Sequence, residues 1–341
     1  MRIVVTGGLG HIGSHLIRQL PLAFPDLEVV ILDNLSTQRY CSLFNLPFDA
    51  NYSFIEADVL TADLRTLLAG TEVVVHLAAA TDAANSFQNK EHVETTNFVG
   101  TERVARACAE LGCGLVFLST TSVYGTQRDV VAEDCPPSDL KPQSPYAVAK
   151  LKAEYLLKDL GDTHALRFVI CRFGTIFGTS VGMRFHTAIN KFCWQAVMGR
   201  PLTVWRTALH QKRPYLDLLD ATSALISIVE KSMFDGAIYN VLTTNATVND
   251  ILCLISAEVP NVSVEYVDTE IMNQLSYTVL NDRFRSKGFE FKGSLERGIR
   301  DTIELLKNSK AESRSVLNPR RTGNKTSEAF DEQQGICLIR P

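Results

Sequence analysis

The chain has 341 residues, of which 45% are hydrophobic, and it carries a formal net charge of -4. This length suits two closely associated domains with a large core. The slightly acidic balance lacks the basic footprint of a nucleic-acid-binding protein, and no apolar run reaches the roughly 18 residues that a membrane span needs. We therefore expect neither nucleic acid nor a membrane as a partner.

The N-terminus and the cysteines indicate where the protein acts. The chain begins with a short β-branched run in place of a signal peptide, so we expect a cytoplasmic protein. None of the eight cysteines belongs to a C-x-x-C pair, which argues against a zinc site and favours free thiols. We expect no bound metal.

Short β-branched runs alternate with amphipathic segments through the first half of the chain. This alternation predicts a doubly wound parallel sheet of the Rossmann type, covered by helices on both faces. The predicted strands are residues 3–6, 28–33, 53–56, 73–77, 114–119 and 164–172, and the clearest predicted helices are residues 11–20 and 94–111.

After Gly178 the pattern changes, and a smaller C-terminal α/β domain is expected. Helices are predicted at 185–198 and 216–231, a strand at 201–205, and a strand at 237–242 that returns to the main sheet. The expected division is a cofactor domain of residues 1–174 completed by the strand near 237–242, a substrate domain of residues 175–236 and 243–307, and a disordered polar tail of residues 308–341.

Gly7, Gly10 and Gly13 follow the first predicted strand and open the first predicted helix. Glycine lets the backbone turn tightly and approach a pyrophosphate closely. The free N–H groups at the start of the helix then favour the phosphates. In this context the glycine spacing predicts a dinucleotide-binding loop.

Asp33 ends the second predicted strand, twenty residues after Gly13. A carboxylate there accepts hydrogen bonds from both adenosine ribose hydroxyls and repels a 2′-phosphate, and no Arg or Lys follows until Arg39. The sequence therefore favours NAD over NADP. A turn-capping role is the alternative for Asp33, and Asp58 either meets the adenine edge or caps the next helix.

Tyr146 and Lys150 are four residues apart, which places both on one face of a predicted helix over residues 146–160. A phenol, with an ordinary pKa near 10, is a poor base, but an adjacent ammonium lowers that pKa. Lys150 also reaches the nicotinamide ribose. Because the pair follows the fifth strand of a dinucleotide fold, it predicts an acid–base pair beside the nicotinamide.

Hydroxyl side chains end that fifth predicted strand, in Ser119-Thr120-Thr121-Ser122. In open α/β sheets the chemistry takes place at the carboxyl ends of the strands, where a hydroxyl can polarise a substrate oxygen. The alternative is a polar strand end that caps the next helix.

These features together resemble the extended short-chain dehydrogenase/reductase family, and more narrowly its NAD-dependent sugar-nucleotide epimerase/dehydratase group. The resemblance covers roughly residues 1–305. Further motifs that carry it are His76-Leu77-Ala78-Ala79, Asn97-Phe98-Val99-Gly100-Thr101, Gln211-Lys212-Arg213-Pro214-Tyr215-Leu216 and Tyr239-Asn240-Val241.

The resemblance implies a role for each matching residue. Thr120, Tyr146 and Lys150 become the catalytic set. The expected NAD contacts are Gly7, Gly10, His11, Ile12, Gly13, Asp33, Asn34, Asp58, Val59, Leu77, Ala78, Ala79, Asn97, Tyr146, Lys150 and Phe173. The expected substrate contacts are Thr121, Thr175, Arg184 and Arg213, where Arg213 binds the substrate diphosphate; for Arg184 the alternative, which the helix pattern favours, is a polar surface residue.

Departures from the group's patterns narrow the expected chemistry. The 4,6-dehydratases carry Asp-Glu directly after the catalytic Thr, whereas Thr121 and Ser122 stand here. Decarboxylases keep that Glu, and reductive epimerases have a Cys where Ser122 stands. The remaining Thr/Tyr/Lys set is that of the 4-epimerases. Thr175 replaces the usual Asn after the sixth strand, so the substrate pose is expected to differ.

We therefore expect an NAD-dependent epimerase that acts at C4 of a nucleotide-diphosphate sugar through a transient 4-keto intermediate. A dehydratase, ketoreductase or dehydrogenase of the same family is the first alternative. A non-catalytic regulator that binds NAD or a nucleotide sugar is the alternative of another class. Helices over 93–111 and 146–160 form a dimer contact in this family, so a homodimer is expected, although the same helices could simply cover the sheet.

Overall fold

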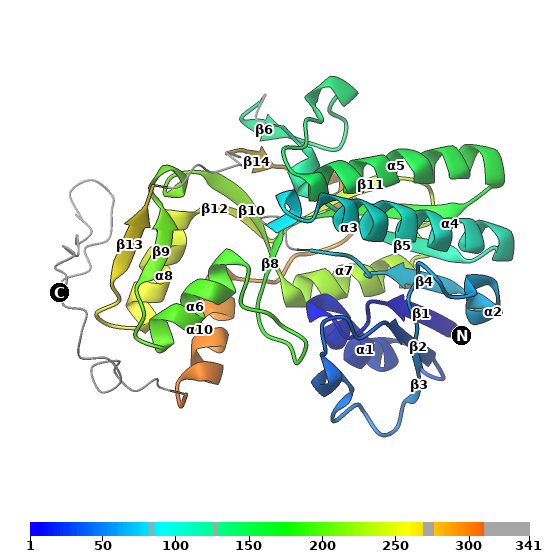
Figure 1. Cartoon of the computed structure of the whole chain (residues 1–341), viewed down its shortest axis with the longest axis horizontal. Coiled ribbons are helices and arrows are strands. Elements are labelled where there is room, and N and C mark those ends of the chain that lie inside the picture. The colour runs from blue at the N-terminus through cyan, green and yellow to red at the C-terminus, as the bar shows by residue number, and fades with distance from the viewer. Residues whose placement is uncertain (82–84, 126–127, 269–275, 310–341) are drawn as a thin grey trace.

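The computed structural model describes residues 1–81, 85–125, 128–268 and 276–309, and within them seven parallel strands form the main sheet (Figure 1). The strand order is β11-β7-β5-β4-β1-β2-β3. This order confirms the predicted doubly wound Rossmann sheet. The strands are β1 (Arg2–Thr6), β2 (Glu28–Asp33), β3 (Asn51–Glu56), β4 (Val73–His76), β5 (Gly114–Thr120), β7 (Arg167–Phe173) and β11 (Ile238–Val241).

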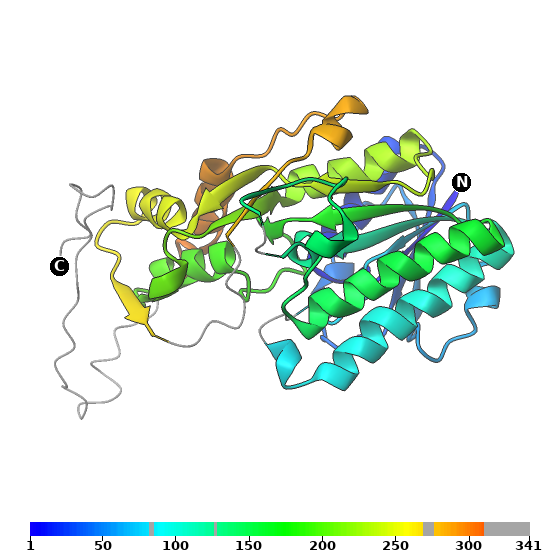
Figure 2. The ribbon, with the colours of Figure 1, turned by 90° about the horizontal axis from the view of Figure 1, so that it is seen from above.

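Helices cover both faces of this sheet, as Figure 2 shows from above. One face packs against α1 (His11–Ala23), α7 (Leu218–Glu230) and α9 (Asp282–Ser286). The other face packs against α2 (Leu64–Leu68), α4 (Gly100–Leu111) and α5 (Pro145–His164). The apolar runs of the strands are buried because each face contributes to its own core.

The sixth strand of the sheet, β7, begins at Arg167 and not at residue 164 as predicted. The reason is that α5 continues to His164. Ala165 then adopts a left-handed φ of 52°, and the N–H of Leu166 donates to the carbonyl of Leu160, which ends the helix. The returning strand predicted at 237–242 is confirmed, since β11 pairs in parallel with β7.

One long predicted helix is divided in the structure. The segment expected as a helix over 94–111 consists of α3 (Lys90–Glu94), a π-helical turn (Thr95–Val99) and α4. Such turns insert one extra residue per turn and often occur at functional sites. Here the turn contains Asn97, which is fully buried.

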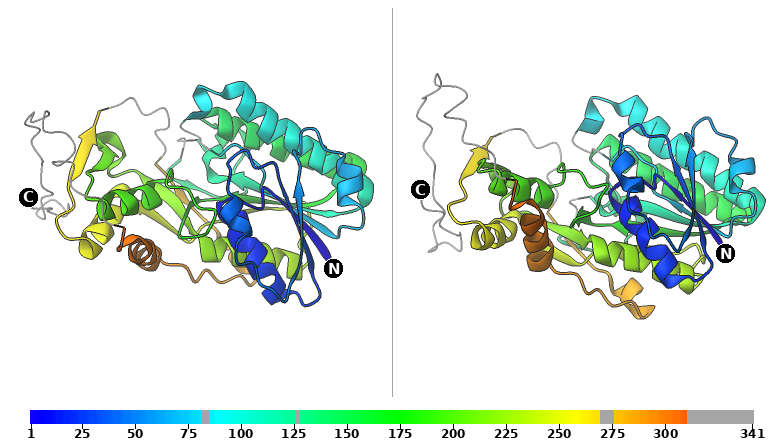
Figure 3. Two further views of the ribbon diagram at one scale, coloured as in Figure 1. Left: turned by 60° about the horizontal axis from the view of Figure 1, so that its bottom comes forward. Right: turned by 90° about the horizontal axis from the view of Figure 1, so that it is seen from below.

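A smaller lobe follows the main sheet and has a separate core (Figure 3). It contains a three-stranded sheet, β12-β10-β8, and a two-stranded sheet, β13-β9. Its elements are β8 (Thr175–Phe177), α6 (Ala188–Val197), β9 (Leu202–Trp205), β10 (Lys212–Asp217), β12 (Thr244–Thr247), α8 (Val248–Glu258), β13 (Val264–Val267) and α10 (Leu295–Leu306).

Helix α7 departs from the expected division of the chain. It lies inside residues 175–236, which were expected to form the substrate domain, yet it packs beside α1 on the main sheet. Its buried residues Leu225 and Ile228 join the same core as Leu16 and Leu20. The predicted helix over 216–231 also begins later, because its first two residues end β10.

Two short strands join distant parts of the chain above the carboxyl edge of the main sheet. β6 (Val130–Val131) pairs in parallel with β14 (Thr278–Val279), and their side chains share a small core with Tyr124 and Tyr277. The expected disordered tail, residues 308–341, lies outside the described residues from residue 310 onward.

Candidate active site

The turn between β1 and α1 is so crowded that only glycine fits at two positions. Gly7 has a φ of +65°, and a Cβ atom there would lie 2.7 Å from the backbone of Ala78. A Cβ atom on Gly13 would lie 2.7 Å from the carbonyl oxygen of Gly7. Gly10 is the N-cap of α1 and offers no side-chain cap. The first N–H groups of α1 are therefore left for an anion, as a pyrophosphate site requires.

Asp33 lies at the end of β2, directly beside this turn. Its carboxylate accepts hydrogen bonds from the N–H groups of Leu9 (3.1 Å) and Leu35 (2.9 Å). These bonds orient the carboxylate, so the turn-capping role and a ribose-binding role are compatible. Asn34 donates to the Asp58 carboxylate at 2.9 Å, and Asp58 also accepts from the N–H of Leu60.

Arg39, the first basic residue after Asp33 in the sequence, reaches the glycine turn. A Cβ atom on Gly10 would lie 3.5 Å from its Nη1 atom. Burial, together with the nearby Arg184 guanidinium, lowers the pKa of Arg39 to about 10. No pattern in the sequence marks this approach, because the intervening residues 34–38 turn back in space.

The segment after β8 lies across the start of α1. His11 Nε2 is 3.0 Å from the carbonyl oxygen of Gly178, and Ser180 donates to the carbonyl oxygen of His11. Burial lowers the pKa of His11 to about 4, so the ring is neutral. A Cβ atom on Gly182 would lie 2.3 Å from the carbonyl oxygen of Leu9. The ring of His11 therefore serves to hold this segment, and only its backbone remains for a phosphate.

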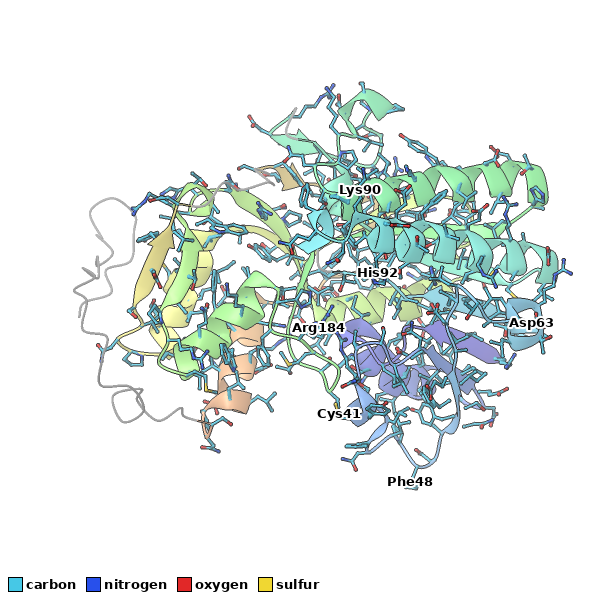
Figure 4. All side chains as sticks on the ribbon, in the orientation of Figure 1. Cys41, Phe48, Asp63, Lys90, His92 and Arg184 are labelled. Atoms are coloured by element: carbon cyan, nitrogen blue, oxygen red, sulfur yellow. The ribbon has the colours of Figure 1, made fainter. Side chains whose placement is uncertain are left out.

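Arg184 ends this segment at the junction of the two lobes (Figure 4). Its Nη2 atom donates to Thr81 Oγ1 at 2.7 Å, so it reaches the chain that follows β4. Its buried Nε atom has no protein partner within the described residues. Arg184 is half-buried and lies close to Arg39, and its expected substrate contact remains a prediction.

The residues after β4 are held from behind by buried polar side chains. His76 Nδ1 lies 2.7 Å from Thr6 Oγ1, which in turn accepts from the N–H of Ala78. Asn97 accepts from the N–H of Ala80 and donates to its carbonyl. Asn97 thus acts through the backbone of this segment. Of the other expected NAD contacts, Val59 and Phe173 are buried, and Ile12, Leu77, Ala78 and Ala79 are half-buried.

Thr120 is the last residue of β5, and its Oγ1 accepts a hydrogen bond from the N–H of Ser122 at 3.1 Å. The capping alternative is therefore observed, while the hydroxyl proton stays free to donate. Thr121 donates its hydroxyl to the carbonyl of Phe173, at 3.3 Å. The Thr121 side chain is thus committed to the fold, and its expected substrate contact remains a prediction.

Tyr146 and Lys150 lie on the first turns of α5, which packs on β5 and on the turn that follows it. Ser144 caps this helix by accepting from the N–H of Ala147, and Pro145 occupies the first helical position, where it needs no N–H partner. Burial raises the pKa of Tyr146 to about 12. The phenol of Tyr146 is therefore protonated at neutral pH.

Lys150 is almost completely buried, with 3% of its surface exposed. Its Nζ atom lies 4.7 Å from the centre of the Phe117 ring, so the structure brings it to the carboxyl ends of β4 and β5. Burial lowers the pKa of Lys150 to about 7, although the Glu154 carboxylate raises it. A titratable group poised near neutral pH at this edge is typical of an active site.

Residues of the smaller lobe approach the same edge. Thr175 lies on β8 opposite Tyr215 of β10, two residues from Arg213. Tyr277, which sequence reasoning missed, donates its hydroxyl to the carbonyl of Thr121 at 2.8 Å. Burial raises the pKa of Tyr277, and the nearby Arg213 guanidinium offsets part of that rise. Arg213 therefore lies close to Tyr277, which contacts the turn after β5.

The polar and charged groups along this edge of the sheet fit a nicotinamide dinucleotide. The glycine turn is a cradle that a single Cβ atom would fill, the first turn of α1 offers N–H groups to phosphates, and Asp33 offers its oriented carboxylate to a ribose. Lys150 supplies a buried cation at the other end of the edge. Within the described residues, no group of three His, Cys, Asp or Glu side chains is placed to hold a metal ion.

A comparison with known families matches residues 3–241 to the model described as the NAD dependent epimerase/dehydratase family. The chain belongs to this family. The match spans the glycine turn, the Tyr146/Lys150 pair and the returning strand β11, so it confirms the resemblance inferred from these motifs. Family members are NAD-dependent, and the donor set described above fits that cofactor.

Curated relatives share a modest part of the sequence. The chain is 30% identical over 318 residues to a trifunctional UDP-glucose 4,6-dehydratase, 3,5-epimerase and reductase from Arabidopsis thaliana, covering 89% of this chain and 46% of that protein. It thus spans about half the length of these first relatives. A mouse dTDP-D-glucose 4,6-dehydratase is 30% identical over 320 residues, covering 89% of this chain and 88% of the relative.

Solved structures share the fold over nearly the whole chain. A UDP-glucuronic acid 4-epimerase from Bacillus cereus, in complex with UDP-glucuronic acid and NAD, superposes with a TM-score of 0.81 at 26% identity. The superposition covers 91% of this chain and 100% of that structure. Among the described residues, no helix is both long and apolar enough to cross a membrane.

Proposed function

We propose that the protein is an NAD-dependent epimerase that inverts C4 of a nucleotide-diphosphate sugar. The observation that carries the proposal is the pair of half-buried Tyr146 and buried Lys150 on the helix that packs on β5 and on the turn after Thr120, where the next two residues are Thr121 and Ser122. Two hydroxyls cannot replace the Asp-Glu pair that removes water in dehydratases. The B. cereus 4-epimerase, which superposes over nearly the whole chain, supports the same choice.

The chain's own residues divide the work of such a reaction. Bound NAD supplies a reversible hydride acceptor. Thr120 donates its free hydroxyl proton to the reacting oxygen, and Tyr146 takes the proton of the C4 hydroxyl and later returns it. Burial raises the pKa of the Tyr146 phenol to about 12. The proposed role of the Lys150 ammonium is to lower that pKa, so that the phenolate becomes accessible near neutral pH.

The smaller lobe is proposed to hold the substrate diphosphate and sugar. Arg213 provides the positive charge for the diphosphate, while Thr175 and Arg184 face the sugar or the second phosphate. Residues 1–174 with the strand near 237–242 are proposed as the cofactor domain, and residues 175–236 and 243–307 as the substrate domain. Helix α7 is the part of that range that supports the cofactor sheet instead.

An assay of the purified chain with NAD and three UDP-sugars tests this function. UDP-glucose, UDP-glucuronic acid and UDP-N-acetylglucosamine would be supplied separately, and the products separated by chromatography and identified by NMR. We expect one of them to be converted to its C4 epimer with no net change in NADH absorbance. A stoichiometric gain of NADH would show a dehydrogenase and overturn the proposal.

A 4,6-dehydratase is the second candidate, because the Arabidopsis and mouse relatives carry that activity in their names. It predicts a product lighter by one water molecule in mass spectrometry, from UDP-glucose or dTDP-glucose. A non-catalytic regulator would retain NAD or a UDP-sugar and convert none of them. Each candidate therefore gives a different result in the same assay.

We also propose that the protein is a cytoplasmic homodimer. Val99, Val148 and Tyr155 are exposed hydrophobic residues on neighbouring helical segments, with 38%, 37% and 47% of their surfaces exposed. A second copy would cover this apolar face. Light scattering on the purified protein is expected to give twice the monomer mass, and Tyr155→Asp is expected to give the monomer mass. Imaging of a tagged chain in cells tests the location.

A further inference from the structure

The catalytic face of α5 extends one turn beyond Lys150, to Glu154, and the proposed mechanism leaves this residue without a role. Tyr146, Lys150 and Glu154 are spaced by four residues, so their side chains follow one line along the helix. Glu154 is almost fully buried, with 1% of its surface exposed. A carboxylate is costly to bury unless it is paired and hydrogen-bonded. The buried Glu154 carboxylate therefore needs hydrogen-bonding or charged partners.

Two strands of the main sheet supply those partners. Ser119 donates its hydroxyl to Glu154 Oε1. Arg172, itself 2% exposed, donates from Nε to Oε1 at 3.0 Å and from Nη2 to Oε2 at 2.6 Å. This is the paired, two-bond geometry that makes Arg–carboxylate contacts strong and directional. The carboxylate is thus held at one place and in one orientation.

The Glu154 carboxylate lies close to Thr120, the proposed catalytic residue at the end of β5. Ser119 directly precedes Thr120 on β5, and Arg172 is its register partner on β7. Glu154 therefore ties the middle of α5 to both strands at the level of Thr120. A shift of the helix along the sheet, which would move Tyr146 and Lys150 relative to Thr120, would break three hydrogen bonds to a buried charge.

Among the groups that surround Lys150, the Glu154 carboxylate carries a negative charge and the neighbouring rings are neutral. Glu154 raises the pKa of Lys150. On β4, burial lowers the pKa of His76 to about 3, so that ring is neutral, and the Phe117 ring of β5 contributes only its π face. The phenol of Tyr146 is uncharged at neutral pH, because burial raises its pKa to about 12. The Arg172 cation, 4.8 Å from the Tyr124 ring, lies behind Glu154 and partly offsets its charge.

We propose that Glu154 is a positioning residue for the catalytic pair: it fixes α5 in register with β5 and β7 and holds a carboxylate one helical turn from Lys150. The inference rests on the proposed NAD-dependent function. Without this carboxylate, burial alone would act on Lys150, and the ammonium would lose its proton at a lower pH. The phenol of Tyr146 would then lose the charge that activates it.

The pH dependence of NAD binding to the full chain provides a readout that does not require catalysis. Calorimetry from about pH 5 to about pH 9 measures the dissociation constant, because the charged Lys150 is the form that donates strongly to the ribose hydroxyls. The wild-type constant is expected to rise above pH 7, where Lys150 titrates. Glu154→Gln is expected to move this inflection down by about one pH unit.

A matched variant shows whether the change is specific. Glu94→Gln removes a carboxylate that pairs with the exposed Lys152 on the outer side of the same helix. It is expected to leave the inflection where it is. Ser119→Ala removes one hydrogen bond to Glu154 and keeps its charge. It is expected to weaken NAD binding or catalysis through position, with the inflection unmoved.

Glu154→Gln leaves Arg172 buried without its counter-ion, and such a variant can unfold. The double variant Glu154→Gln/Arg172→Met leaves no unpaired buried ion, and the same downward shift is expected in it. An unmoved inflection in a folded variant, or an unfolded double variant, overturns the proposal. Absence of NAD binding in the wild type overturns the proposed function instead, so the two failures are distinguishable.

Discussion

The glycine turn and the catalytic face of α5 are built on opposite principles, although they serve one site. The turn depends on backbone shape, because Gly7 and Gly13 leave no room for even a single Cβ atom. The catalytic face depends on charge, because Lys150 and Glu154 are both buried ionisable groups and Glu154 is paired with Arg172. A local spacing of glycines in the sequence encodes the shape of the turn. The charge that pairs with Glu154 comes instead from Arg172 on the separate strand β7.

The difference predicts that each region fails in its own way. A substitution in the turn should act through space and backbone strain, independent of pH. A substitution on the α5 face should act through protonation, so its effect should change with pH. Four variants test this contrast, from the largest expected effect to the smallest.

Tyr146→Phe removes the phenol that is proposed to move the C4 proton. We expect the rate of epimer interconversion to fall by about a thousandfold, while the fold and NAD binding are retained. Product formation is measured by chromatography of the UDP-sugars. A variant that keeps its activity would show that another group is the acid–base, and the catalytic assignment would be abandoned.

Lys150→Met removes the buried cation. Burial lowers the Lys150 pKa from its ordinary value of 10.5 to about 7, so the unfolded chain binds the extra proton between these values. Stability of the wild type relative to Lys150→Met should therefore rise from about pH 7 to about pH 10, by up to about 4 kcal/mol. Urea unfolding at a series of pH values measures the difference. A difference that stays constant with pH contradicts the charge argument.

Gly7→Ala tests the turn against a matched glycine. A methyl group at Gly7 meets the backbone of Ala78 and also suffers the strain of a positive φ, so we expect a loss of at least about 3 kcal/mol in unfolding free energy. Gly70 has a similar φ of +72° but open space around it, and Gly70→Ala should cost about 1 kcal/mol. Equal losses in the two variants would show that crowding at Gly7 is irrelevant.

Asp33→Asn keeps the shape of the side chain and removes its charge. The N–H groups of Leu9 and Leu35 donate to different oxygens of the carboxylate. An amide offers only one such oxygen, so at most one of the two N–H groups keeps its acceptor. We expect NAD to bind about tenfold more weakly and the preference over NADP to narrow. Calorimetry with both dinucleotides measures this. An unchanged preference would locate the NAD/NADP discrimination elsewhere, with Arg39 as the nearest cation.

The sequence predicted those parts of the protein that are local. Alternating runs predicted the parallel sheet, and the glycine spacing predicted the turn after β1, because each pattern lies within about 20 residues. The spacing of Tyr146 and Lys150 placed both on one helix face. Element ends were less accurate, as at β7, because the end of α5 depends on how Ala165 and Leu166 close the helix.

Only the tertiary structure decided which distant groups meet these local features. Glu154 binds Arg172, 18 residues away, and Tyr277 binds the carbonyl of Thr121 across 156 residues of sequence. Arg184 and Arg39 approach each other from different lobes. Pairing of buried charges is set by packing in three dimensions, and no period or spacing in the chain records it. The sequence by itself therefore determined a dinucleotide turn and a Tyr/Lys pair, and the fold determined the charges that let the pair work.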